Sequence, residues 1–192
     1  MTESTRVPRA ELTGIYGSVL KMAMRKLLGG VPQGAEVLWN HPAVFKDAMK
    51  LGQRQEKWDS LDENLASFAT MAAAAEIGCS FCLDLGYFKA HNDGLDEDKA
   101  REVPRWRESE VFTTLERQVM EYAVAMCQTS PTVTDDLSDA LLAQLGAEAM
   151  VELAAKVAFM NMSARMNVAL GIHSEQYADA CGLKPLAVGS TV

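Results

Sequence analysis

Two cysteines whose spacing could support thiol chemistry, Cys79 and Cys82, lie three positions apart in the 192-residue sequence. The segment around them predicts that Gly78 ends one helix and that Cys79 begins the next. Unpaired N–H groups and the helix dipole would stabilise a thiolate there and lower the cysteine pKa from about 8.5. Cys82 would follow one turn later on the same face, at a spacing that permits a disulfide. One thiolate could attack a peroxide or a disulfide, and the other thiol could resolve the product.

Two other interpretations of the pair compete with redox chemistry. Buried cysteines can occur in an alanine-rich helix without a chemical role. A zinc site would need more ligands, and the sequence has no second cysteine pair or Cys/His doublet to supply them. The remaining cysteines, Cys127 and Cys181, could contribute only if the C-terminal segment folded back. Cys127 falls on a predicted buried stripe, which favours an inert core thiol. The leading hypothesis is a redox pair with no metal and no cofactor.

The elements that position the pair are predicted to be helices. Apolar residues repeat at helical spacing, and no segment alternates as a strand would. With 11 methionines and only 7% aromatic residues, the core should consist of small and adaptable side chains that suit close-packed helices. We therefore predict an all-α fold in which the last helix, apolar on almost all sides, is the most buried. The predicted helices cover residues 12–28, 62–77, 79–91, 96–104, 113–126, 134–145 and 147–170, with two shorter ones that meet at His41-Pro42.

Charge and hydropathy exclude several classes of partner. The formal net charge is -8 and the pI is near 4.9, so an acidic surface would repel a phosphate backbone, and nucleic-acid binding is disfavoured. The polar N-terminus lacks the apolar core of a signal peptide, and no stretch approaches the roughly 18 apolar residues of a membrane span. We expect a cytoplasmic protein that binds neither nucleic acid nor membrane.

The segment 69–82, in which the run GCSFC follows an alanine-rich helix, resembles the redox-active branch of the carboxymuconolactone decarboxylase/AhpD-like family. Weaker likeness lies in Trp106 with segment 111–116, and in segment 161–171, which reads NMSARMNVALG. The resemblance implies one AhpD-like helical domain over residues 1–192, with an N-terminal helical extension over about 1–34. It also implies a homo-oligomer, because such proteins assemble as trimers or hexamers.

The same resemblance implies an activity. Redox-active members include alkylhydroperoxidases with peroxiredoxin-type antioxidant activity, so the substrate would be a small hydroperoxide and an unidentified thiol would act as reductant. Two alternatives stay open. One is a decarboxylase of a small lactone acid, for which Arg165 is a candidate cation. The other is a non-catalytic redox sensor or scaffold in which the dithiol switches stability or binding.

The sequence departs from the AhpD-like proton relay at two positions. The pattern has a histidine four residues after the second cysteine and a glutamate about three turns before the first; this chain has Gly86 and Ser67 there. Glu76 is the candidate replacement, because it could reach a water shared with Cys79 across the helix break. His91 would lie about 13 Å from Cys82 along a continuous helix, which excludes direct contact within that helix.

Several other polar residues near the pair have structural interpretations. Asp84 is predicted to lie on the surface and Tyr87 in the core. Asn161, Arg165 and Asn167 interrupt an apolar helix, and buried polar groups need partners. We expect these three to bond loop backbone or an acid such as Glu116, with a structural role favoured over substrate binding.

Overall fold

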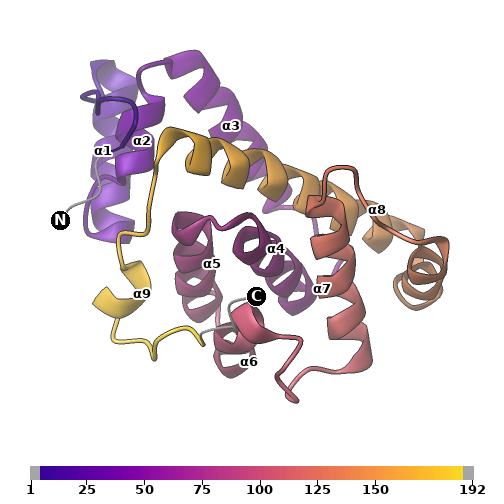
Figure 1. Ribbon diagram of the computed structural model, residues 1–192. Coiled ribbons are helices and arrows are strands. Elements are labelled where there is room, and N and C mark those ends of the chain that lie inside the picture. The colour runs from indigo at the N-terminus through magenta and orange to yellow at the C-terminus, as the bar shows by residue number, and fades with distance from the viewer. Residues whose placement is uncertain (1–4, 188–192) are drawn as a thin grey trace.

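The computed structural model describes residues 5–187. All secondary-structure elements assigned in that range are helices, as predicted. Figure 1 shows the helices arranged around α4 and α5 in the middle of the molecule. None of the helices in the described range is long and apolar enough to cross a membrane. The elements are α1 (Gly14–Leu28), α2 (Gln33–Leu38), α3 (Pro42–Gln55), α4 (Glu63–Ile77), α5 (Ser80–Asn92), α6 (Glu97–Glu102), the 3-10 helix η1 (Val103–Arg105), α7 (Thr114–Cys127), α8 (Asp135–Leu170) and α9 (Tyr177–Ala180).

Helix α4 is the centre of the core and packs against α5, α7 and α8. Its alanines explain this position, because four of them are fully buried and their small side chains let three helices approach closely. The prediction that the last long helix is the most buried was wrong. Helix α8 exposes Val151, Met162 and Val168, because it lies across the outside of the bundle and buries one side only. The buried alanines of α4 are Ala69, Ala72, Ala73 and Ala74.

Helix boundaries lie close to the predicted ones, and side chains cap several of them. The Asp62 carboxylate accepts the backbone N–H of Leu65 at the start of α4. Thr113 and Glu116 form a capping box at the start of α7, within the helix predicted over residues 113–126. The expected division between residues 145 and 147 is also present, because Gly146 interrupts α8 with a non-helical backbone at φ 78° and ψ 169°.

The N-terminal segment behaves differently from its sequence pattern. Leu12 is buried but precedes α1, which begins at Gly14. Other apolar residues of the predicted stripe face outward, with Ile15 89% and Val19 58% exposed. The segment nevertheless contacts the C-terminal end of α8, since the Arg6 guanidinium donates to carbonyl groups of its last turn. A cation at a helix C-terminus also interacts favourably with the helix dipole.

The C-terminal segment returns over α5 through Asp84, which corrects the predicted surface position of this residue. Asp84 is buried, and its carboxylate accepts the backbone N–H groups of Tyr177 and Ala178 and the hydroxyl of Ser174. These bonds cap the short helix α9, which the sequence pattern did not predict, and they offset the cost of burying a charge. Tyr87 lies in the core, as predicted.

Gly78 makes the turn that joins α4 to α5. Its φ of 77° is in the left-handed region, and the N–H groups of Gly78 and Cys79 donate to the carbonyls of Ala75 and Ala74. This is the pattern of a Schellman cap. A Cβ at position 78 would meet nothing within 4 Å, so a substitution there changes backbone strain alone.

We therefore predict that Gly78→Ala lowers the free energy of unfolding by about 1–2 kcal/mol, the cost of left-handed backbone for a residue with a Cβ. Urea denaturation followed by circular dichroism measures the change. Gly30→Ala is the matched control, because that position also has open space around it and its φ lies outside the left-handed region. Equal stability of the Gly78→Ala variant and the wild type would contradict the strain argument.

Candidate functional site

The two cysteines meet at the start of α5. Cys79 is the N-cap residue of this helix, and its sulfur accepts the backbone N–H of Cys82 at 3.3 Å. The two Sγ atoms lie 2.8 Å apart. A disulfide needs about 2.05 Å, so a small movement of the side chains would bring the sulfurs to bonding distance. The structure thus brings together the two residues that the sequence predicted as a redox pair.

Electrostatics give the two sulfurs different roles. The hydrogen bond from the Cys82 side chain is the main cause that lowers the pKa of Cys79, from an ordinary value of 9.0 to about 7. Burial opposes this change, while the Cys82 N–H and the Asn167 amide reinforce it. The same shared hydrogen bond, together with burial and the negative charge of Cys79, raises the pKa of Cys82 strongly. Cys79 is therefore the thiolate, and Cys82 keeps the proton.

Both thiols are buried in an apolar environment. Cys79 is 1% exposed and Cys82 is 7% exposed. Ala74 of α4 and Ala164 of α8 belong to the same buried cluster. A polar contact comes from α8, where the side-chain amide of Asn167 donates to the Cys82 sulfur at 3.3 Å. Four partly buried side chains complete the surroundings, namely Ile77, Phe81, Leu83 and Met160.

Phe81, between the two cysteines, is covered by segments from both ends of the chain. Its ring packs edge-on against Tyr177, with the ring centroids 6.3 Å apart. On α2, Gly34 lies beside this ring, because a Cβ there would make ordinary contact with Ile172 at 3.4 Å and with Phe81 at 3.8 Å. The side chain of neighbouring Gln33 donates to the carbonyl of His173, which ties α2 to the C-terminal segment. Helix α2 and the C-terminal segment 172–177 together form a cover over Phe81, beside the dithiol.

The side chain of Met71 lies beside both positions where the family pattern has a relay residue, Gly86 and Ser67. A Cβ at Gly86 would lie only 2.9 Å from Cγ of Met71, so the Met71 side chain occupies the space that a histidine would need. The Ser67 hydroxyl contacts the Met71 sulfur at 3.8 Å. Both departures from the family pattern therefore converge on one apolar side chain of α4.

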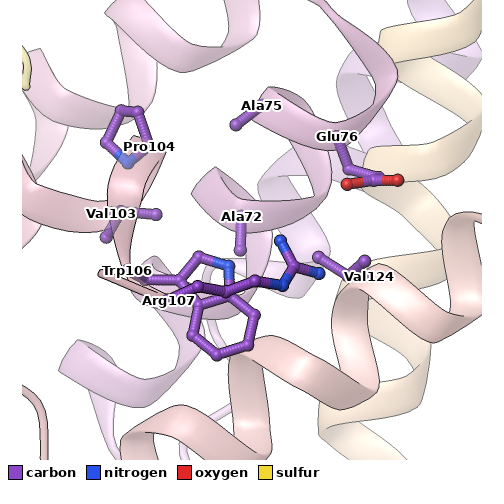
Figure 2. A pocket seen from close by; sticks show the side chains of 8 residues that line it. All are labelled: Ala72, Ala75, Glu76, Val103, Pro104, Trp106, Arg107 and Val124. Atoms are coloured by element: carbon purple, nitrogen blue, oxygen red, sulfur yellow. The ribbon is translucent and has the colours of Figure 1, made fainter. Parts of the chain in front are cut away.

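Glu76 lies in the last turn of α4, on a surface cavity. It is exposed, and its carboxylate accepts the side-chain amide of Gln128 at 2.7 Å. Figure 2 shows the Arg107 guanidinium extending over Trp106 toward the side of the cavity on which Glu76 lies. No hydrogen bond within residues 5–187 joins Glu76 to either sulfur, and its water-mediated role stays a prediction. The cavity has a volume of about 100 Å³ and is lined by Ala72, Ala75, Glu76, Val103, Pro104, Trp106, Arg107 and Val124.

The remaining polar candidates have other partners. His91 is exposed and contacts Glu97 at 2.7 Å. The Arg165 guanidinium donates to the backbone carbonyl of Cys127, the last residue of α7, and not to loop backbone as expected. The expectation that Glu116 is a partner was wrong, because Lys99 pairs with that carboxylate at 2.7 Å.

Cys127 is a buried thiol apart from the pair. Burial is the main cause that raises its pKa, which agrees with an inert core thiol. The Asn161 amide donates to its sulfur at 3.3 Å. Sequence reasoning thus missed two sulfur partners, Asn161 and Asn167. Their signal was present as polar residues within an apolar helix, but the sequence could not indicate which atoms they face.

Comparison with known proteins gives the context of this site. Residues 42–125 match the model of the carboxymuconolactone decarboxylase family. The uncharacterized protein YnjA of Escherichia coli is 35% identical over 128 residues, which cover 67% of this chain and 70% of YnjA. The family match includes α4, α5 and both cysteines of the pair.

Solved structures share the fold. A cysteine-to-alanine variant of the debrominase Bmp8 in complex with 2,3,4-tribromopyrrole has a TM-score of 0.77 at 17% identity, and the match covers 92% of this chain and 97% of that one. A peroxidase-related protein from Ralstonia eutropha, described as an alkylhydroperoxidase AhpD core, has a TM-score of 0.76 at 19% identity, over 90% and 94% of the two chains. Together with the family model and the relative YnjA, these likenesses lead to one conclusion: the chain belongs to the carboxymuconolactone decarboxylase/AhpD-like family.

Proposed function

We propose that this protein is a thiol-dependent peroxidase that reduces small hydroperoxides with the Cys79–Cys82 dithiol. The observation that carries the proposal is the pair of sulfurs 2.8 Å apart at the start of α5, with Cys79 as the N-cap residue. A thiolate at a helix N-terminus with a proton-bearing thiol beside it has both parts that the chemistry needs, a nucleophile and a resolving group.

The reaction balances with these two residues. The Cys79 thiolate attacks the outer oxygen of ROOH, the O–O bond breaks, and RO⁻ takes a proton to leave as ROH. Cys79 becomes a sulfenic acid, which is the reversible first stage of thiol oxidation. Cys82 then loses its proton and attacks the Cys79 sulfur, so that hydroxide leaves, is protonated to water, and the disulfide forms. A thiol reductant supplies two electrons and two protons to restore the dithiol.

Burial favours small substrates. With Cys79 only 1% exposed, an oxidant must pass the surrounding apolar side chains, including the covered ring of Phe81. A small hydroperoxide needs less displacement of this cover than a protein disulfide.

Reductive dehalogenation is a second candidate, favoured by the fold match to the debrominase Bmp8 over 92% of this chain. The same dithiol could supply two electrons to a small aryl bromide, which would give the hydrogen-substituted ring, bromide, a proton and the disulfide. A lactone-acid decarboxylase would not need the pair at all. Bromide release, peroxide consumption and lactone turnover therefore separate the candidates.

Substitution of the cysteines should give two different results. We expect Cys79→Ser to abolish hydroperoxide consumption, because the attacking thiolate is lost. We expect Cys82→Ser to react once and then stop at the sulfenic acid, which dimedone labelling and mass spectrometry detect. Cys181→Ser is the control, since Cys181 is exposed and lies outside the pair. Full turnover in a Cys79→Ser, Cys82→Ser double variant would refute a thiol mechanism.

The pH dependence follows from the Cys79 thiolate. Its pKa of about 7 means that the thiolate fraction, and with it the rate of the first step, should rise with pH and reach half its maximum near pH 7. Because the Cys82 side chain is the main cause of the low pKa, Cys82→Ala should move the midpoint to higher pH. Thiolate ultraviolet absorbance and single-turnover rates report both midpoints. An unchanged midpoint in Cys82→Ala would contradict the assigned cause.

A further inference from the structure

Asn167 presents an unusual contact for a buried amide. It lies on the last turn of α8, is 6% exposed, and its side-chain N–H donates to the Cys82 sulfur at 3.3 Å. A buried amide needs good hydrogen-bond partners, and a neutral thiol is only a weak acceptor. A thiolate is a much stronger acceptor, because hydrogen bonds to a charged group are shorter and stronger than neutral ones. The contact is therefore best satisfied when Cys82 is ionised.

The end of α8 holds this amide in place. The backbone carbonyl of Asn167 accepts the N–H of Ile172 at 2.9 Å, which closes the turn after the helix. The Arg6 guanidinium donates to the carbonyls of Val168 and Ala169 at 2.7 Å and 2.9 Å, and the Arg6 N–H donates to Leu170 at 2.9 Å. Four successive carbonyls of the last turn are thus bonded, and the side chain of Asn167 is supported by a rigid backbone.

We propose that Asn167 is a catalytic residue of the resolving step, in which its amide stabilises the thiolate that forms on Cys82. This inference rests on the proposed dithiol chemistry. In the resting pair, the Cys82 thiol donates a hydrogen bond to the Cys79 thiolate. Once Cys79 is a sulfenic acid or a mixed disulfide, its negative charge is gone, and Cys82 must ionise in a buried site. Asn167 is the contact from outside the pair that favours this ionisation.

The step can be isolated from peroxide chemistry with a small neutral disulfide, 4,4′-dithiodipyridine. The Cys79 thiolate attacks it, releases one thiopyridone and forms a mixed disulfide. The Cys82 thiolate then attacks the Cys79 sulfur, releases the second thiopyridone and forms the Cys79–Cys82 disulfide. The exposed thiol of Cys181 would also release thiopyridone, so every variant in this experiment carries Cys181→Ser. The two releases from the pair then appear as two phases of absorbance, and attack and resolution are measured separately.

We expect Asn167→Ala to slow the second phase about 10- to 100-fold, the range for loss of a hydrogen bond to a charged group, with a smaller effect on the first. Asn167→Asp keeps the shape but replaces the N–H donor with an anion. It should slow the second phase further and move its pH midpoint upward, because a negative neighbour disfavours a thiolate. This pH shift is a result that a purely structural role would not produce.

Asn161→Ala is the matched control. Asn161 lies on the same helix and makes the same 3.3 Å amide contact, but with the sulfur of Cys127. The second phase of the Asn161→Ala variant should match that of the wild type. Second phases that are unchanged in both Asn167 variants would overturn the inference, and so would the absence of any release from the parent chain with Cys181→Ser. Normal wild-type phases that slow in the Asn167 variants, without any hydroperoxide consumption, would support the role of Asn167 and refute the peroxidase.

Discussion

The site depends on one hydrogen bond shared between two sulfurs at the start of α5. With the Sγ atoms 2.8 Å apart, a proton on Cys82 stabilises negative charge on Cys79, and that charge in turn holds the proton on Cys82. The chain needs three local features to achieve this: a left-handed glycine at position 78, a cysteine at the N-cap, and a second cysteine one turn later. The bundle then has to keep water away from the pair without displacing either sulfur.

Burial sets the conditions under which this pair can react. Desolvation alone would raise the pKa of both thiols, and it does so at Cys79 as well, where it opposes the hydrogen bonds. The pKa of Cys79 is nevertheless lowered to about 7, because the hydrogen bonds from Cys82 and Asn167 outweigh the effect of burial. The same burial places the pair behind the cover formed around Phe81 by α2 and the C-terminal segment.

Prediction from sequence succeeded where one local pattern determined the structure. The helix starts at Asp62 and Thr113, the turn at Gly78 and the proximity of Cys79 to Cys82 all depend on residues within a few positions of one another. It failed where the outcome depended on distant segments. Asp84 is buried because α9 returns over α5, and α8 is exposed on one side because of where it packs. A single-sequence pattern of apolar residues carries no information about either contact.

Helix α8 provides an internal comparison that shows what the amide contacts do. Asn161 and Asn167 each donate to a cysteine sulfur at 3.3 Å. At Cys127 the amide favours the thiolate, yet burial dominates and the pKa of that thiol is raised. An amide alone is therefore too weak to make a buried cysteine reactive. Near the dithiol, the same contact acts beside a helix N-terminus and a second sulfur that can change its charge. The difference between an inert thiol and a reactive one then lies in the neighbouring cysteine and the turn that presents it, and the Asn167 amide adds a smaller contribution at both sulfurs.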